Sequence, residues 1–390
     1  SGTAKMKGHI NIAAFMQSIN LIIKQYDAFR IHITSVDGVP QQYVVPYEER
    51  QLECLDLTHI DSISEVEALL EQHKSKPLPL LDSELFQFLI VKISEEEYWI
   101  NIKMHHIISD GISMVVYGNQ LTAFYMDLIQ GNEPKLSDDC SYIEYIADEN
   151  AYELSDRYQK DKAYWLDKFS DLPELTGWKS YNPLSLSTQA VREHFTVPET
   201  LYNELQAFCQ QNRISLFQFF MGAMYIYIHK VTNQPDVVIG TSFANRGNKK
   251  EKQKIGMFVS TAAARTYVDK DVEVLSFLQE VARDQMSVLR HQKYPYNQLI
   301  QDLREMHGNK DIQRLFGVSM EYRLINWVDL DDVRILTDYD FCGDEVNDFV
   351  LHIVEILDEG ELVLDIDYRT KLFERSEVTD MVSQLLTIAE

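Results

Sequence analysis

The stretch that decides the fold is Tyr98-Trp99-Ile100-Asn101-Ile102-Lys103-Met104-His105-His106-Ile107-Ile108-Ser109-Asp110-Gly111. Up to Met104 one set of alternate positions holds Tyr, Ile, Ile and Met, and the other set holds Trp, Asn and Lys. This is the two-residue period of a β-strand. Beyond Gly111 the apolar residues recur every three or four positions, at Met114, Tyr117, Leu121, Phe124 and Leu128. That spacing predicts a helix. The two histidines therefore lie on a strand-to-helix elbow, where a rigid scaffold commonly presents functional side chains.

Strand and helix patterns continue on both sides of this elbow. The opening residues indicate a strand remnant, and Asp37-Gly38 marks the turn of a hairpin. We expect helices near residues 15–26, 64–73, 111–128, 152–169, 200–212, 216–231 and 275–290. We expect strands at 85–93, 98–104 and 236–241, and hairpins at 29–45 and 350–368. The pattern is that of a mixed α/β protein.

Chain length and one loop-like stretch indicate two lobes. At 390 residues the chain exceeds the usual size of a single domain. Residues 173–189 contain two prolines, a glycine and several serines, which is typical of a linker. We therefore assign residues 1–172 to an N-terminal lobe that carries the histidines and residues 173–390 to a C-terminal lobe.

Charge and cysteine usage exclude several classes of protein. A net charge of −25 disfavours a nucleic-acid or anionic-membrane surface, because both attract clustered Lys and Arg. The four cysteines are far apart and form no zinc-ligand spacing, which indicates free thiols in a reducing compartment. No apolar run is long enough to span a membrane, and the first residues do not resemble a signal peptide. We expect a cytoplasmic protein without a membrane span.

The residue types of the elbow suit proton-transfer chemistry. A histidine titrates near neutral pH and can accept a proton from an attacking amine. A nearby carboxylate such as Asp110 can order the loop through a buried arginine, and Gly111 permits a tight turn. Two other interpretations are open: a merely packed or exposed histidine pair, and a metal site. Adjacent residues at a strand end point to opposite faces, which disfavours metal binding by both His105 and His106.

Five further stretches, in order, carry a resemblance to a known family. They are Asp27-Ala28-Phe29-Arg30, Val238-Ile239-Gly240-Thr241 with Asn245-Arg246, Ile255-Gly256-Met257-Phe258-Val259-Ser260-Thr261, His291-Gln292-Lys293-Tyr294-Pro295-Tyr296, and Leu315-Phe316-Gly317-Val318-Ser319-Met320-Glu321-Tyr322. Together with His105-His106-x-x-x-Asp110-Gly111, they resemble the condensation domains of nonribosomal peptide synthetases. That family is related to chloramphenicol acetyltransferase and has the hallmark HHxxxDG.

The resemblance implies a fold and a set of site residues. The fold would be two acetyltransferase-like lobes in a V-shaped pseudo-dimer with a central tunnel. His106 would be the catalytic histidine, with His105, Asp110 and Gly111 completing the catalytic motif. Asp110 would be structural and paired with Arg30. His291 is expected to be a structural residue of its own motif.

The resemblance also suggests a subtype. The segment that opens the family's first lobe is absent from this sequence, Gln25 stands where many members have arginine, and Ser260 replaces a usual asparagine. Ser260 and the residues after Gly111 are most similar to starter condensation domains, which initiate surfactin-type lipopeptides. We assign substrate contacts to Ser109, Ser260, Lys249 and Lys250. Lys249 and Lys250 belong to a cationic run, with Lys252 and Lys254, that could attract the phosphates of an acyl-CoA.

The implied reaction forms an amide between a donor acyl thioester, such as a fatty acyl-CoA, and the amine of a carrier-bound aminoacyl thioester. The domain itself would bind no cofactor or metal, since its substrates ride on phosphopantetheine or coenzyme A. Its partners would be a carrier protein, an adjacent adenylation domain and the acyl donor, in lipopeptide or antibiotic biosynthesis. Two alternatives are open: an internal condensation domain with a peptidyl-carrier donor, and an inactive module that recruits carriers.

Overall fold

The computed structural model describes residues 1–60, 62–175, 187–325, 334–339, 341–357 and 360–390. Backbone contacts divide the chain into two compact units. The first unit comprises Ser1–Glu153, Arg246–Phe258 and Trp327–Cys342. The second unit comprises Leu154–Asn245, Val259–Asn326 and Gly343–Glu390.

These units differ from the predicted lobes 1–172 and 173–390. Residues 154–172 group with the second unit because Trp165 and Phe169 share an apolar cluster with Leu299, Leu303 and Phe316. Residues 246–258 group with the first unit because Ile255 and Phe258 are buried in its core. Most of the linker predicted at residues 173–189 lies outside the described residues.

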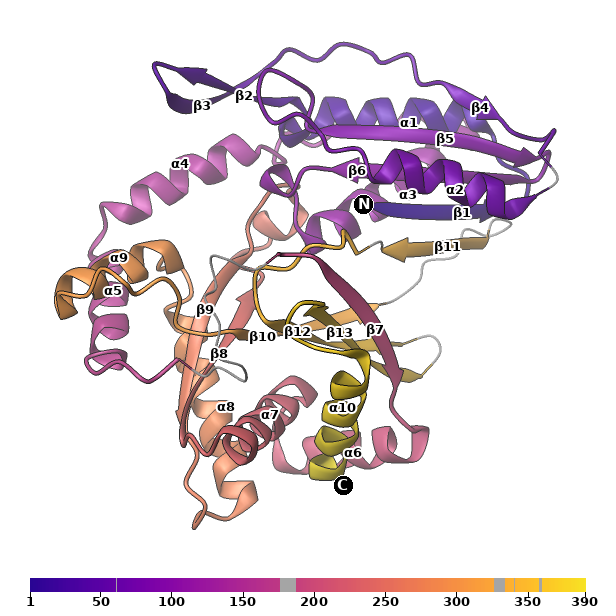
Figure 1. The fold of residues 1–390 in the computed structure, drawn as a ribbon. Coiled ribbons are helices and arrows are strands. Elements are labelled where there is room, and N and C mark those ends of the chain that lie inside the picture. Colours follow the sequence, from indigo (N-terminus) through magenta and orange to yellow (C-terminus); the bar gives the residue numbers. More distant parts are fainter. Residues whose placement is uncertain (61, 176–186, 326–333, 340, 358–359) are drawn as a thin grey trace. The chain divides into compact units, whose positions relative to one another are not determined.

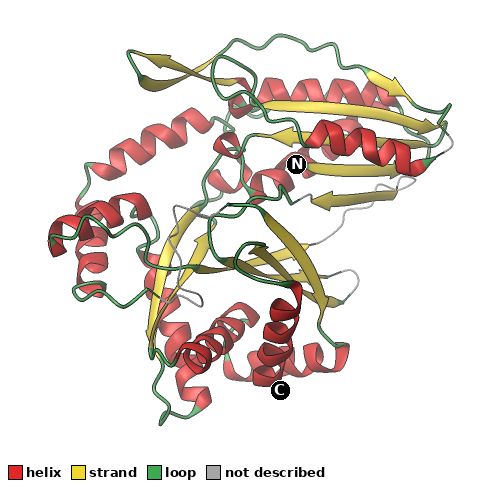
Figure 2. Ribbon diagram, viewed as in Figure 1, coloured by secondary structure: helices red, strands yellow, loops and turns green. Residues whose placement is uncertain are grey.

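A five-stranded sheet forms the centre of the first unit, in the order β11-β1-β6-β5-β4 (Figures 1 and 2). Its strands are β1 (Gly2–Lys7), β4 (Cys54–Asp56), β5 (Phe86–Ser94), β6 (Glu97–Met104) and β11 (Arg334–Tyr339). The predicted strand pair around the elbow is confirmed as the antiparallel pair β5 and β6. A separate hairpin of β2 (Ile31–Val36) and β3 (Val39–Val44) turns at Asp37 and Gly38, whose φ angles of 51° and 80° suit a tight turn.

Helices cover both faces of this sheet. They are α1 (Ile12–Gln25), α2 (Ile63–Lys74) and α3 (Gly111–Ile129). A fourth helix, α4 (Tyr142–Glu153), packs against the 3₁₀ turn Asp27–Arg30. Ile100 and Ile102 of β6 share an apolar cluster with α1 and α3, whereas Trp99 shares one with Val66 and Leu70 of α2. The alternation along β6 therefore serves two cores, one on each face of the sheet.

The second unit is built on a six-stranded sheet in the order β7-β13-β12-β10-β8-β9. Its strands are β7 (Ala190–Thr196), β8 (Asp236–Phe243), β9 (Ser260–Tyr267), β10 (Val318–Ile325), β12 (Phe349–Ile356) and β13 (Glu361–Arg369). Its helices are α5 (Asp156–Lys168), α6 (Glu199–Asn212), α7 (Leu216–Thr232), α8 (Val274–Arg290), α9 (Tyr296–His307) and α10 (Arg375–Ala389). One face of the sheet packs on α6, α7, α8 and α10, and α5 and α9 pack near β8 and β9.

The predicted elements and the mixed α/β class are confirmed, with ends shifted by a few residues. Sequence reasoning missed α4, α9 and α10, together with several strands. Within the described residues, no helix combines the length and the apolar character that a membrane crossing requires.

Candidate active site around His106

The predicted elbow is present. Strand β6 ends at Met104, a single 3₁₀ turn follows at His106–Ile108, and α3 begins at Gly111. The Ser109 hydroxyl is buried and lies 3.4 Å from the His105 carbonyl oxygen, to which it donates. The turn is therefore closed by its own residues, and His105 and His106 stand in successive positions at its start.

The two histidines differ in environment. His105 is half-buried, and its Nδ1 accepts a hydrogen bond from the Ile107 amide at 3.1 Å. Burial, and then the neighbouring His106, lower the pKa of His105. His105 is thus a neutral imidazole that closes the turn. His106 is exposed, and its ring makes no hydrogen bond or ion pair within the described residues.

Asp110 holds the start of α3 through both carboxylate oxygens. Its Oδ1 accepts from the Ser113 amide at 2.8 Å, as an N-cap does, and from the Arg246 guanidinium at 2.9 Å. Its Oδ2 accepts from the Phe258 amide at 3.0 Å. Both side chains of the Asp110–Arg246 pair are almost completely buried. None of these bonds reaches either histidine.

The predicted pairing of Asp110 with Arg30 is wrong. Arg30 instead donates to the backbone carbonyls of Ile23 and Val45, at 3.2 and 3.1 Å, and so ties the end of α1 to the β2–β3 hairpin. Arg246 belongs to one of the stretches that carry the family resemblance, but separation along the chain does not indicate which arginine pairs with Asp110. The arginine nearer in sequence proved to be the wrong one.

The segment 246–258 is organised around the Arg246 side chain. The guanidinium donates to the carbonyls of Glu251 and Lys254 and stacks over the Phe258 ring at 3.9 Å. Burial lowers the pKa of Arg246, while the charge of Asp110 acts in the opposite direction. The loop therefore folds around a cation that the Asp110 carboxylate neutralises.

Ser113 and Gly256 complete this network. The Ser113 hydroxyl is buried within hydrogen-bonding distance of Asp110, Arg246 and both backbone polar groups of Gly256. A Cβ on Gly256 would lie 2.2 Å from the ring of Tyr142, the first residue of α4. The amide of Tyr142 is in turn bound by the Asp27 carboxylate at 2.7 Å. The stretches that begin at Asp27, His105 and Arg246 thus meet in one cluster.

The tight-turn role predicted for Gly111 is wrong. Its φ angle is not in the left-handed region, and a Cβ at this position would meet no atom within 4 Å. Glycine is therefore not required here by the backbone or by packing. Gly111 is itself exposed, so a side chain at this position would extend into open space.

The four residues predicted to contact substrate lie in different environments. Ser109 is turned inward, as described above, whereas Ser260 is half-buried on β9 and its hydroxyl has no hydrogen-bond partner within the described residues. Lys249 is exposed, and Lys250 lies 2.6 Å from Asp139, which raises the pKa of that lysine. Their contacts with substrate stay predictions.

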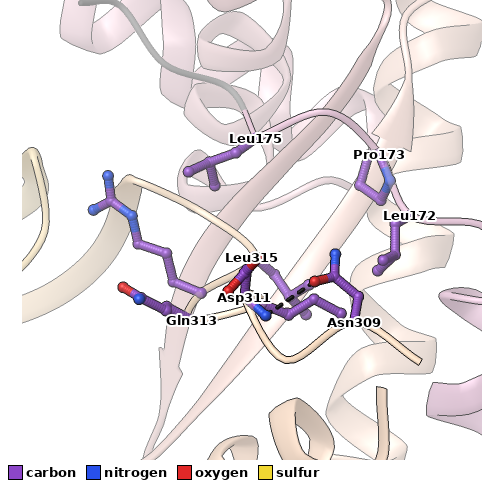
Figure 3. A pocket seen from close by; sticks show the side chains of 9 residues that line it. Leu172, Pro173, Leu175, Asn309, Asp311, Gln313 and Leu315 are labelled. Atoms are coloured by element: carbon purple, nitrogen blue, oxygen red, sulfur yellow. Dashed lines mark hydrogen bonds between the residues drawn. The ribbon is translucent and has the colours of Figure 1, made fainter. Parts of the chain in front are cut away.

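Other potential sites show less convergence of polar groups. A cavity of about 400 Å³ in the second unit lies between Leu172, Pro173 and Leu175 and the loop Asn309–Leu315, and contains none of the predicted site residues (Figure 3). His291 is held by the buried Asp161 at 2.7 Å and stacks on Tyr164, as expected for a structural residue. Within the described residues, no three His, Cys, Asp or Glu side chains are placed to share a metal ion.

Comparisons with known proteins show the family of the chain. The family model for the condensation domain matches residues 1–390. The chain is 38% identical over 381 residues to surfactin synthase subunit 1 of Bacillus subtilis (strain 168), covering 96% of this chain and 10% of that protein. It is 34% identical over 388 residues to a plipastatin synthase polypeptide of the same strain, covering 99% of this chain and 15% of that protein. The chain thus spans only a small part of these relatives.

Solved structures show the same fold. The starter condensation domain of rhizomide synthetase, in complex with C8-CoA, superimposes with a TM-score of 0.85 at 21% identity, covering 100% of this chain and 89% of the other. The condensation enzyme VibH superimposes with a TM-score of 0.82 at 19% identity, with coverages of 100% and 89%. Since the hallmark elbow, the fold and the family model agree over the whole length, the chain belongs to the condensation-domain family of nonribosomal peptide synthetases, which are amide-forming acyltransferases.

Proposed function

We propose that this chain is a starter condensation domain that transfers a fatty acyl group from coenzyme A to the amine of an aminoacyl thioester on a carrier protein. Two similarities support the starter subtype. The sequence is similar to surfactin and plipastatin synthases, and the fold is similar to that of a starter domain solved with C8-CoA. The carrier and a neighbouring adenylation domain would be its partners, and we expect the reaction to take place in the cytoplasm.

The reaction needs alignment more than strong acid–base chemistry. The amine nitrogen attacks the thioester carbonyl, the C–N bond forms, the C–S bond breaks, and the thiol leaves with a proton. An α-amino group has a pKa of about 8, so a modest base can keep its lone pair available. Thioesters are already activated, and holding two tethered reactants together can supply much of the rate.

The observation that carries the proposal is the contrast between His106 and the polar groups around it. Asp110, Ser113 and Arg246 are buried and bonded to one another, and His105 is committed to its turn. Of the two histidines in the motif, His106 is the one whose imidazole is exposed, and its ring makes no hydrogen bond or ion pair to any described residue. It can therefore accept the amine proton as a general base, or orient the amine through a hydrogen bond.

Asp110 and Arg246 have a positioning role in this proposal. Their ion pair fixes the start of α3 against the 246–258 loop, and the elbow precedes that start by only a few residues. Because Asp110 makes no hydrogen bond to a histidine, it does not act as the third member of a catalytic triad. Catalysis by His106 thus depends on the pair through the geometry of the backbone.

The structure bears differently on the predicted substrate contacts of Ser260 and of the lysine run. A buried hydroxyl without a partner is uncommon, so the Ser260 oxygen is suited to a hydrogen bond with substrate. Lys249 is an exposed cation without an ion pair, whereas Lys250 and Lys254 face Asp139 and Glu144. The cationic run proposed for the donor phosphates is therefore reduced to Lys249 and Lys252, which weakens its expected attraction for acyl-CoA.

Mass spectrometry of the acceptor tests the proposal. The chain is incubated with an aminoacyl-loaded carrier and either an acyl-CoA or a peptidyl-carrier donor, with His106→Ala as the inactive control. We expect an N-acyl product from acyl-CoA. A product from the peptidyl carrier alone would instead identify an internal condensation domain. No product from either donor, with a carrier that still binds, would identify a recruitment module.

A further inference from the structure

A cationic hollow lies on the surface of the second unit, where the turn between α6 and α7 meets α8. Its volume is about 710 Å³. We define this arginine hollow by its lining residues Asn212, Arg213, Ile214, Gln218, Gln279, Ala282, Arg283, Met286 and Arg290. Three of these nine residues are arginines and none is acidic, although the chain has 61 Asp and Glu against 36 Lys and Arg. The composition of the hollow is thus opposite to that of the protein.

In the part of the chain that the structure describes, the three guanidinium groups have no partner. Arg213, Arg283 and Arg290 are exposed, and none makes a side-chain hydrogen bond or ion pair within the described residues. The nearby carboxylate of Asp284 is already bound by Lys168 at 2.6 Å. Arg290 is favoured by the helix dipole in the last turn of α8, but this effect does not account for the other two arginines.

Arg213 also occupies a position that disfavours it. It ends α6 in the left-handed conformation, with φ of 56° and ψ of 41°, where a residue with a Cβ is strained. The left-handed ends of α7 and α9 have Asn233 and Gly308, the residue types that suit such ends. A strained residue that keeps a long charged side chain beside two other arginines points to a role other than helix termination.

Three of the lining residues, Ile214, Ala282 and Met286, are apolar. Arg283, Met286 and Arg290 are three to four residues apart and therefore follow one stripe of α8. Met286 is 47% exposed and lies between Arg283 and Arg290 along that stripe. Arginine and methionine are both enriched in protein interfaces, where an exposed Met adapts to the partner surface.

We propose that the arginine hollow docks an acidic amphipathic helix of a partner protein. Apolar residues of that helix would cover Met286, and carboxylates on its flanks would meet the three guanidinium groups. A small phosphate ligand suits the hollow less well, because it would leave the exposed Met286 in water and because, within the described residues, no carboxylate holds the three arginines in place. This proposal does not depend on which acyl donor the domain uses.

Binding of a model helix tests the charge requirement. The probe is a fluorescent peptide of about five helical turns, with leucines along one face flanked by glutamates, and its twin has glutamine at each glutamate. Fluorescence anisotropy compares the wild type with the triple variant Arg213→Gln, Arg283→Gln, Arg290→Gln. We expect the variant to bind the glutamate peptide at least about tenfold more weakly, and the difference to shrink at high salt.

A charge-matched control makes the result specific. The triple variant Lys270→Gln, Lys310→Gln, Lys371→Gln removes three exposed cations of the second unit that have no ion pairs. It should bind the peptide like the wild type. Equal weakening by both triple variants, or equal binding of the glutamine peptide, would overturn the proposal. The proposal would also be overturned if the wild type bound inorganic phosphate but not the glutamate peptide, and the arginine variant lost the phosphate binding.

Arg213→Gly separates docking from stability. Glycine relieves the left-handed strain, so Tm should rise by about 2 °C while peptide binding weakens by about threefold. The matched control is Asn233→Gly at the end of α7, which should leave binding unchanged. An Arg213→Gly protein that is more stable and binds the peptide as tightly as the wild type would show that Arg213 does not contribute to the hollow.

Discussion

Each unit contains a buried ion pair between an aspartate and an arginine close to a histidine in the chain or in space, and the two histidines differ in burial and bonding. In the first unit Asp110 and Arg246 are paired under the elbow, and His106 stays exposed beside them. In the second unit His352 is 3% exposed, and its Nε2 lies 2.8 Å from Asp367, which also binds Arg192 at 2.6 Å. The first network fixes a backbone turn and leaves the histidine of that turn exposed, whereas the second network binds its histidine in a buried ion pair.

The difference shows how a histidine can be assigned from its surroundings. His352, on β12, is bonded to Asp367 and lies 3.2 Å from Glu321, so the position of its ring is set by the sheet. The ring of His106 has no such bonds among the described residues and is exposed to solvent. A motif identifies candidate histidines, but the partners of each ring decide which one is available for chemistry.

The largest expected effect follows from Asp110→Ala. The substitution leaves Arg246 buried without its carboxylate and removes the N-cap of α3, which should cost about 3–5 kcal/mol of unfolding free energy. Chemical denaturation measures this loss. A matched control is Arg30→Ala, which removes an arginine that the structure places away from Asp110 and should cost much less. Equal losses for the two variants would contradict the Asp110–Arg246 pairing.

His352→Ala should destabilise the second unit by about 2–3 kcal/mol, because it leaves a cavity and removes a partner of Asp367. Its pH dependence is more specific. Burial raises the pKa of Glu321, but the hydrogen bond and charge of His352, together with Arg323 and Ser242, outweigh burial and lower that pKa to about 2. A lowered carboxyl pKa stabilises the fold above the unfolded pKa of about 4.3, and that stability is lost as pH falls towards 2.

The unfolding free energy of the wild type should therefore fall more steeply than that of His352→Ala between about pH 4.5 and pH 2. Denaturation curves at several pH values measure both slopes. Parallel slopes would show that His352 does not set the ionisation of Glu321.

Local patterns predicted the elbow, whereas long-range pairing could not be predicted. The alternation from Tyr98 to Met104 and the helical spacing after Gly111 depend on neighbouring residues only, and both predictions are confirmed. Strand β1 pairs with β11 across more than 300 residues, as Thr3 does with Asp338. No sequence period encodes such a pairing, and for the same reason Arg246 was passed over in favour of Arg30.

Gly256→Ala should cost about 1–2 kcal/mol, because the added methyl group would overlap the buried Tyr142 ring. Gly111→Ala is the matched control, since its Cβ would meet nothing within 4 Å and should leave Tm unchanged. Thermal unfolding compares the two proteins. Loss of activity in a stable Gly111→Ala protein would indicate that the open space at Gly111 is used by substrate. A Gly111→Ala protein as destabilised as Gly256→Ala would contradict the difference in packing between the two glycines.

His105→Ala should have the smallest effect, about 1 kcal/mol of stability, because it removes one hydrogen bond to the Ile107 amide. The rate of amide formation should fall by less than about tenfold, through a looser turn. Asparagine at this position can accept the same bond, so His105→Asn should recover part of the stability. Failure of both variants to fold would show a larger structural role than one hydrogen bond explains.

The central claim is that His106 alone supplies the chemistry of the elbow, and the single-turnover rate of amide formation by His106→Ala tests it directly. Because His106 is exposed and unbonded, Tm should not change, while the rate should fall at least about a hundredfold, far more than for His105→Ala. A folded His106→Ala protein that is as active as His105→Ala would contradict the account.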